Sequence, residues 1–232
     1  MVGRSQAQPA IGDLRSPFDF EILLSASYAE LRSNHFHGGL DFKTGGVVGK
    51  HIKCVADGYI CRASVTPGGY GKALYVMHDN GYMTVYAHLD RFPDAIAKRV
   101  RDYQYNNECF EADLYFAPGD YPVQRGEFLA SAGNTGYSFG PHLHMEIRTT
   151  DTNEPIDPLP FYKHLIADNI APRATHIMVY GAKGDGKVTS AVDSKEVKEM
   201  DGKIIFNSQF SILNFLTAWG RISAAISAND YM

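Results

Sequence analysis

The chain has 232 residues, a length that suits one large domain or one ordinary domain with a small unit beside it. Hydrophobic residues make up 44% and charged residues 21%, a globular composition that excludes wholesale disorder. The formal net charge is -4 and no basic stripe runs along the chain, so we expect no nucleic-acid partner. No apolar stretch approaches the roughly 20 residues that span a bilayer, so we expect no transmembrane segment.

The N-terminal residues leave the cellular compartment open. Met1 to Ala10 lack the apolar core of a secretory signal, so the chain is either cytosolic or a mature-like fragment whose signal has been removed. The three cysteines, Cys54, Cys61 and Cys109, are too few and too odd in number for a disulfide framework.

The first half of the chain reads as short strands and tight turns. Residues 17–30 are expected to form an opening strand or loop. Two hairpins follow, one turning at Asp57-Gly58 and the other at Asn80-Gly81, because these dipeptides between apolar runs are typical of two-residue turns.

The first of these hairpins has a consequence for two cysteines. With Asp57-Gly58 as the turn, Cys54 and Cys61 become direct cross-strand neighbours, with about 5.5 Å between their Cα atoms. That distance permits a disulfide; the alternative, which we favour, is a pair of packed thiols.

Residues 91–107 change to a helical period, because Ala95, Ile96, Val100 and Tyr103 fall at helical spacing. Strand character returns at residues 110–116, and a glycine-rich loop then leads into the strand-like segment HLHMEIR, residues 142–148. A proline-rich exit ends this part of the chain.

A change of composition near residue 166 marks a domain boundary. We assign residues 1–16 to an N-terminal extension, residues 17–165 to one domain and residues 166–232 to a small C-terminal β unit. Residues 175–180 and 203–206 are strand-like, and residues 183–187 read as a loop. The last segment stops without a turn or cap, so we expect a β-sandwich-like unit that is cut short, in a natural protein that is longer.

Histidines carry most of the chemical information. Two His-x-His pairs occur, His35/His37 and His142/His144, where chance predicts less than one. Residues two apart on a strand share a face, so HLHMEIR places His142, His144 and Glu146 on one side and its apolar residues on the other.

The segment HGGLD contains a second group of polar residues that could share one face. Gly38 and Gly39 disfavour a helix, so His37 and Asp41 are expected on an extended segment that faces one way. Two imidazoles and a carboxylate without cysteine match a catalytic zinc site, which uses three protein ligands and keeps a fourth position open.

These motifs resemble a known family. The order HGGLD, YAHL and GPHLHMEIR, together with VADG at 55–58, GYG at 69–71, HDNGYMTVYAHL at 78–89, V-x-x-G-E at 123–127 and SAGNTG at 131–136, is similar to the lysostaphin-like zinc endopeptidases of the M23 or LytM type. The resemblance covers roughly residues 30–150.

The resemblance implies a mainly β, antiparallel fold with a groove that binds the peptide part of peptidoglycan. It assigns the Zn²⁺ ligands to His37, Asp41 and His144, and the catalytic histidines to His142 and His88. His142 is then expected to act as general base and His88 to stabilise the oxyanion; the reverse assignment of these two roles is the alternative. All five positions are intact, whereas some relatives have lost ligands and only activate other hydrolases.

Four further residues have two interpretations each. His35 is a groove or outer-sphere residue, or else a plain surface histidine. Glu146 either orients an imidazole or faces solvent, and Asn134 and Thr135 shape the loop or the groove.

Residues 91–125 form an insertion that is longer than the family's short form. They are either a surface embellishment or a wall of the substrate groove, with Tyr103, Tyr105, Phe110 and Tyr115 as apolar contacts.

The sequence therefore predicts a zinc metalloendopeptidase that cleaves peptide cross-links of peptidoglycan in the cell envelope, periplasmic or secreted. The C-terminal unit is expected to pack or to dock an envelope protein. One alternative is a non-catalytic envelope protein that binds peptidoglycan or regulates another hydrolase. Occlusion of the groove by residues 1–16 or by the insertion could also silence the enzyme. Another is a zinc carboxypeptidase that trims terminal D-alanine.

Overall fold

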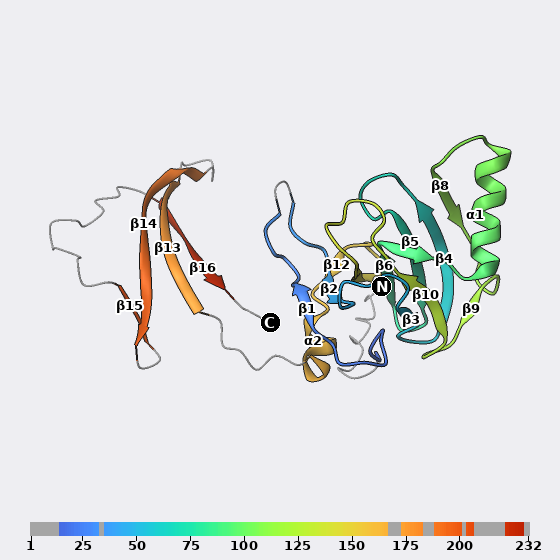
Figure 1. Ribbon diagram of the computed structural model, residues 1–232, viewed down its shortest axis with the longest axis horizontal. Helices are drawn as coiled ribbons and strands as arrows, with labels where there is room; N and C mark the ends of the chain where they lie inside the picture. Colours follow the sequence, from blue (N-terminus) through green and yellow to red (C-terminus); the bar gives the residue numbers. More distant parts are fainter. Residues whose placement is uncertain are drawn as a thin grey trace, which may run out of the picture. The chain divides into compact units, whose positions relative to one another are not determined.

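A computed structural model describes residues 14–32 and 35–166, and the backbone of four strands farther along, residues 173–182, 188–200, 203–206 and 221–229 (Figure 1). The chain divides into two compact units, Met1–Ala167 and Asp168–Met232. Within the described residues, no helix is long and apolar enough to cross a membrane.

A nine-stranded antiparallel sheet forms the first unit, as the predicted mainly β fold requires. Its strand order is β1-β2-β11-β6-β5-β4-β8, with β12 paired to β11 and β9 paired to β4. The strands are β1 (Leu24–Ala26), β2 (Leu40–Lys43), β4 (Gly58–Val65), β5 (Lys72–His78), β6 (Tyr82–Ala87), β8 (Ala112–Tyr115), β9 (Pro122–Val123), β11 (His142–Thr149) and β12 (Pro155–Ile156).

A second, three-stranded sheet packs into the same core. It consists of β3 (His51–Lys53), β10 (Phe128–Ala132) and β7 (Leu89–Arg91), in the order β3-β10-β7. Ile52 and Leu129 of this sheet join Leu143 and Met145 of β11 in one apolar cluster, and all four are fully buried. Burial of this apolar surface is the main stabilising contribution to the fold.

The buried core of the first unit extends from Leu14 to Tyr162 along the chain. Leu14, which the sequence places in the N-terminal extension, is 2% exposed, and the N–H of Arg15 donates to the carbonyl of Val55 at 3.0 Å. At the other end, α2 (Leu159–Tyr162) buries Phe161 and Tyr162 and is followed by the 3-10 helix η1 (Lys163–Leu165). Residues 1–13 lie outside the described part, so the suggested occlusion of the groove by residues 1–16 stays a prediction.

The helix predicted in the insertion is confirmed as α1 (Asp94–Asn106), which buries Ile96 and Val100. The strand predicted at residues 110–116 is confirmed as β8, which pairs with β4. Figure 1 shows α1 and β8 together at the edge of the large sheet, away from β1 and β2.

One predicted hairpin is confirmed and the other is wrong. Strands β5 and β6 pair across Asn80-Gly81, where Gly81 has a positive φ of 84° and the Asn80 side chain accepts from the Tyr82 N–H. Strand β4, however, pairs with β5, β8 and β9, whereas β3 pairs with β10 in the other sheet. The chain crosses between two sheets at Asp57-Gly58, because β3 finds its partner more than seventy residues away in β10.

Because that hairpin does not form, Cys54 and Cys61 are not cross-strand neighbours. Cys54 is buried and its S–H donates to the carbonyl of Ala56 at 3.1 Å. The S–H of Cys61 instead donates to the carbonyl of Tyr75 on β5, and all three cysteines are free thiols. The favoured alternative, packed thiols, holds for Cys54 and Cys61, but they lie on segments that do not pair.

The described strands of the second unit form one antiparallel sheet. Its order is β15-β14-β13-β16, with β13 (Arg173–Ala182), β14 (Val188–Met200), β15 (Lys203–Phe206) and β16 (Arg221–Asn229). The strands predicted at residues 175–180 and 203–206 fall in β13 and β15, and the loop predicted at 183–187 lies outside the described residues. A sandwich needs a second sheet, which the described strands do not include.

Candidate metal centre

Strands β2 and β11 place two of the predicted ligands side by side. In their antiparallel ladder Asp41 is the direct partner of His144. The neighbouring residues Leu143 and Met145 point into the core and are fully buried, as the alternation of HLHMEIR predicts. Asp41 and His144 therefore share the opposite face of the sheet.

His37 reaches this face from the connection before β2. The predicted extended segment begins only at Leu40, because the chain first crosses over β11 at Gly38 and Gly39. A Cβ atom on Gly39 would lie 2.2 Å from the carbonyl oxygen of Met145, so a side chain there would push the crossing away from the strand. The two glycines thus bring the His37 ring down to Asp41.

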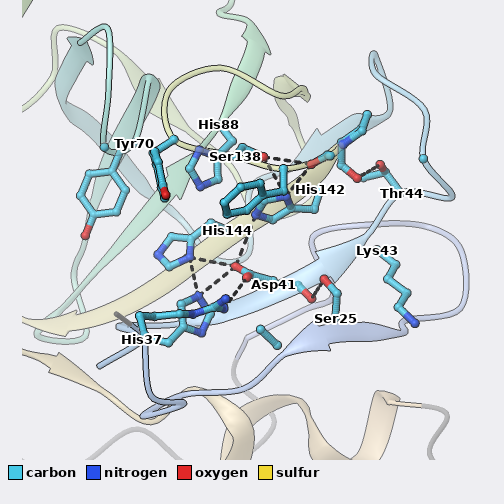
Figure 2. A pocket seen from close by; sticks show the side chains of 18 of the residues that line it. Ser25, His37, Asp41, Lys43, Thr44, Tyr70, His88, Ser138, His142 and His144 are labelled. Carbon is cyan, nitrogen blue, oxygen red and sulfur yellow. Dashed lines mark hydrogen bonds and ion pairs between the residues drawn. The ribbon is translucent and has the colours of Figure 1, made fainter. Parts of the chain in front are cut away.

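The three predicted ligands form a tight cluster in Figure 2. His37 Nε2 lies 3.0 Å from Asp41 Oδ1 and 2.9 Å from His144 Nδ1, and His144 Nδ1 lies 2.9 Å from Asp41 Oδ1. Ligand atoms around a tetrahedral zinc ion with bonds of about 2.0–2.1 Å lie about 3.3 Å apart. The cluster is therefore within a few tenths of an ångström of the spacing that zinc requires.

Outer hydrogen bonds aim the lone pairs of both rings at the centre. His37 Nδ1 lies 2.8 Å from the carbonyl oxygen of Ser27, and a carbonyl only accepts, so Nδ1 carries the proton and Nε2 faces inward as an acceptor. His144 Nε2 lies 3.0 Å from Glu146 Oε1 and donates to it, which leaves Nδ1 facing inward. In these neutral tautomers, two lone pairs and a carboxylate oxygen converge without a donor, which fits a divalent cation. In the metal-free protein, a ring that donates to Asp41 must instead be protonated.

Both carboxylate oxygens of Asp41 contact groups that stabilise its negative charge. Burial alone raises its pKa, but hydrogen bonds with His144 and His37 outweigh burial and hold the pKa well below its ordinary range. The second oxygen, Oδ2, accepts from Arg32 Nη2 at 3.2 Å. The Asp41 carboxylate is therefore an anion at any pH near neutrality.

The two remaining predicted histidines lie beside this cluster. His142 Nε2 is 3.6 Å from Asp41 Oδ1, and the ring centres of His142 and His88 are 4.8 Å apart. His142 Nδ1 lies 2.8 Å from the carbonyl oxygen of Gly140, and His88 Nδ1 lies 2.9 Å from that of Thr135. In their neutral forms both rings therefore carry the proton on Nδ1 and leave Nε2 as an acceptor.

The backbone of His88 is held in an unusual conformation. Its φ is +57°, a region that a side chain with a Cβ seldom adopts, at the point where the chain passes from β6 to β7. Its N–H donates to the carbonyl of Tyr70 at 2.9 Å. Burial lowers the pKa of His88 to about 4 although the hydrogen bond with Thr135 opposes it, so His88 is neutral near pH 7.

Thr135 links the glycine-rich loop to three other residues of the site region through hydrogen bonds. Its hydroxyl donates to the carbonyl of Leu89 and accepts from the N–H of Lys72, both at 2.9 Å, while its own carbonyl holds His88. The loop can approach this closely because Gly136 and Gly71 pack against each other; a Cβ on Gly136 would lie 2.2 Å from the Gly71 nitrogen. Asn134, by contrast, is exposed and does not line the cavity around the cluster.

The cluster lies at the base of a cavity of about 1210 Å³. His35 is exposed and lines this cavity, as do the aromatic side chains of Tyr137 and Phe139, which are 72% and 93% exposed. No described residue of the insertion 91–125 lines it. The insertion instead lines a second cavity of about 510 Å³, to which Tyr103 and Asp113 contribute, and Tyr70 lines both cavities.

Sequence reasoning gave no role to four residues that build the site. Arg32 binds Asp41, Ser138 lies 3.2 Å from His142 Nδ1, and Tyr70 and Arg148 both contact Glu146. Tyr70 stands inside the GYG motif, which was the only available signal for it.

Comparison with known proteins agrees with this geometry. Residues 35–104, which include two of the clustered ligands, match the family model described as Peptidase family M23. This part of the chain is similar to peptidase family M23. The predicted resemblance is confirmed.

Two curated proteins that the chain resembles are named as peptidases. The chain is 31% identical over 146 residues to the DD-carboxypeptidase/endopeptidase Mpg of Neisseria meningitidis serogroup B, a match that covers 63% of this chain and 26% of that protein. It is 28% identical over 130 residues to the glycyl-glycine endopeptidase ALE-1 of Staphylococcus capitis, covering 55% and 29%. The match thus spans about a quarter of the length of these relatives.

One solved structure is similar to the same part of the chain. The catalytic domain of lysostaphin from Staphylococcus simulans is 23% identical, with a TM-score of 0.45 over 61% of this chain and 92% of that one.

Proposed function

We propose that this protein is a zinc-dependent endopeptidase that hydrolyses peptide cross-links of bacterial peptidoglycan. The observation that carries the proposal is the convergence of His37 Nε2, Asp41 Oδ1 and His144 Nδ1 within 3.0 Å of one another, with the acceptor nitrogens of two further histidines beside them. A metal site next to a general base is the arrangement that peptide hydrolysis requires.

His37, Asp41 and His144 would hold the ion, and three protein ligands leave a fourth position open. Zinc, when bound there, supplies Lewis-acid chemistry that polarises a peptide carbonyl and makes water a stronger nucleophile at neutral pH. The anionic Asp41 offsets part of the positive charge of the ion, and the buried sheet face keeps the ligands fixed.

His142 and His88 would move the proton. Each neutral ring presents Nε2 as an acceptor toward the cavity, so either can take the proton of the attacking water. The ring that takes it becomes an N–H donor that stabilises the oxyanion developing on the scissile carbonyl. A neutral His88 with its proton on Nδ1 has no hydrogen to donate from Nε2, so the expected oxyanion role follows only after that ring is protonated.

The substrate class rests on the relatives and on the cavity. ALE-1 is named a glycyl-glycine endopeptidase and Mpg a DD-carboxypeptidase/endopeptidase, so both act on peptides. An open cavity of about 1210 Å³ suits an extended peptide that enters and leaves past the ligands. Such a substrate places the protein in the cell envelope, periplasmic or secreted, where the C-terminal unit would dock an envelope protein.

A digestion experiment tests the proposal. Purified peptidoglycan is incubated with the full chain, with and without a chelator, and the products are identified by mass spectrometry. Chelator-sensitive release of cross-link fragments is the expected result. The His142→Ala protein, which keeps all three ligands, serves as the matched control and should release little.

Other products would assign the site differently. Release of terminal D-alanine alone, without cross-link fragments, would make the protein a carboxypeptidase. No release from a protein that binds zinc stoichiometrically would overturn the enzymatic proposal and favour a non-catalytic regulator that binds the wall.

A further inference from the structure

Three residues behind the metal ligand His144 have no role in the proposed reaction. Glu146 stands two residues after His144 on β11 and is 1% exposed. Tyr70 comes from the loop before β5, and Arg148 stands two residues beyond Glu146 on the same strand face. All three lie on the Nε2 side of the His144 ring, opposite the cluster with His37 and Asp41.

Both oxygens of the Glu146 carboxylate are bound. Oε1 accepts from His144 Nε2 at 3.0 Å and from the Tyr70 hydroxyl. Oε2 accepts from Arg148 at 2.6 Å, and the Arg148 guanidinium also donates to the Tyr70 hydroxyl oxygen at 3.0 Å. The three side chains therefore form a closed ring of hydrogen bonds around the carboxylate.

The surroundings of the Glu146 carboxylate restrict its rotation and favour its ionised form. A Cβ on Gly38 would lie 2.9 Å from Glu146 Oε1, so the crossing chain covers that oxygen closely. A buried carboxylate is costly unless a charge and hydrogen bonds compensate it, and Arg148 supplies the charge. Tyr70 and Arg148 thus stabilise an anion whose only described contact toward the metal site is the His144 ring.

We propose that Glu146, held by Tyr70 and Arg148, is a positioning residue that fixes the tautomer and orientation of His144 and so raises the metal affinity of the site. Accepting from Nε2–H leaves the Nδ1 lone pair directed at the cluster and makes that nitrogen more basic. The inference rests on the proposed zinc site, and it adds two residues, Tyr70 and Arg148, to those on which metal binding depends.

The test measures zinc affinity of the full chain by competition with a chelator at pH 7, without substrate. Glu146→Gln keeps the shape but loses the charge, and we expect zinc to bind roughly 10–100-fold more weakly. Tyr70→Phe removes one hydrogen bond to the carboxylate and should weaken binding about threefold to tenfold. Arg148→Met should resemble Glu146→Gln, and Arg148→Lys, which restores the charge, should recover part of the loss.

Two control variants use residues of the second cavity that do not contact Glu146. Arg62 pairs with Asp113 at 2.6 Å, and Tyr103 belongs to α1. Arg62→Met and Tyr103→Phe remove the same chemical groups as Arg148→Met and Tyr70→Phe, and both should bind zinc within about twofold of the parent protein. The melting temperature of each metal-free variant confirms that it is folded at the temperature of the titration.

The outcomes separate this inference from the proposed function. Wild-type zinc affinity in folded Glu146→Gln and Tyr70→Phe would overturn the positioning role while leaving a zinc peptidase in place. Equal weakening in Arg62→Met and Tyr103→Phe would overturn it too, because the effect would then be one of general stability. A parent protein that does not bind zinc would remove both proposals.

Discussion

The ligand cluster and the facing pair of histidines are built in different ways. Asp41 and His144 are partners in the β2–β11 ladder, and their ligand atoms lie 2.9 Å apart. His142 is the first residue of β11 and His88 follows the last residue of β6, and each imidazole Nδ1 is held by the carbonyl of a loop residue. Strand pairing thus sets the positions of two of the three predicted ligands, whereas loop carbonyls orient the rings of the two predicted catalytic histidines.

This difference predicts two kinds of effect from substitutions at the site. A change in the cluster should remove the metal and everything that depends on it. A change in the histidine pair should leave the metal in place and affect mainly turnover, because neither His88 nor His142 belongs to the cluster of three predicted ligands. The contact between His142 Nε2 and Asp41 Oδ1 is a long one, at 3.6 Å.

The largest effect is expected for His144→Ala. Two ligands cannot hold the ion as three do, so stoichiometric zinc binding should disappear and turnover should fall on the order of 10³-fold or more. Metal analysis of the purified protein and peptidoglycan digestion measure the two losses. His51→Ala makes the same chemical change at an exposed position on β3 and should leave both unchanged; a similar loss there would show that the assay does not report the site.

The next largest effect is expected for His142→Ala and His88→Ala. Each should bind one zinc ion per chain with near-parent affinity, while turnover falls by at least about 10²-fold because the proton acceptor or the oxyanion donor is missing. Single-turnover digestion and metal analysis measure both quantities. Full activity in either variant would remove that histidine from the mechanism.

A smaller effect is expected for Thr135→Val, which keeps the shape of the side chain. It loses the hydroxyl contacts with Leu89 and Lys72, so the loop that holds His88 should loosen. We expect a loss of about 1–3 kcal/mol in the free energy of unfolding and about a tenfold loss of turnover, with zinc affinity unchanged. Thr150→Val, at an exposed position whose hydroxyl donates to Gly81, is the control and should change neither by much.

The smallest effect is the dependence of metal-free stability on pH. Burial alone lowers the pKa of His144, but hydrogen bonds with Asp41 and Glu146 outweigh it and raise the pKa to about 9, above the ordinary 6.5. The resulting stabilisation is complete below pH 6.5 and is lost as the pH rises toward 9. Burial lowers the pKa of His78, so its contribution is present above pH 6.5 and is lost as the pH falls.

Melting temperatures between pH 5 and pH 9 measure this dependence. The metal-free protein should be most stable near pH 6.5 and should lose stability on both sides. Excess zinc should remove the loss on the alkaline side, since zinc binds the deprotonated ring of His144 and binds more tightly as the pH rises. A metal-free melting temperature that rises steadily from pH 6.5 to pH 9 would contradict the environment assigned to His144.

Local pattern predicted the elements whose determinants lie close together in the chain. The alternation in HLHMEIR identified the buried face of β11, and Asn80-Gly81 identified a hairpin because both strands flank the turn directly. The same rule failed at Asp57-Gly58, because β3 pairs with β10 and not with its neighbour in sequence. Local turn chemistry cannot report a competing partner that is more than seventy residues away.

By itself, the sequence determined the chemistry of the site: two histidines and an aspartate with glycines between them, and two further histidines in an ordered set of motifs. Only the tertiary structure decided that Glu146 is buried against His144, that Tyr70 and Arg148 hold it, and that the insertion lines a second cavity. The physical reason is that residue type and spacing determine which groups are present. Contacts such as that between Tyr70 and Glu146, 76 residues apart, arise only when strands from distant parts of the chain pack together.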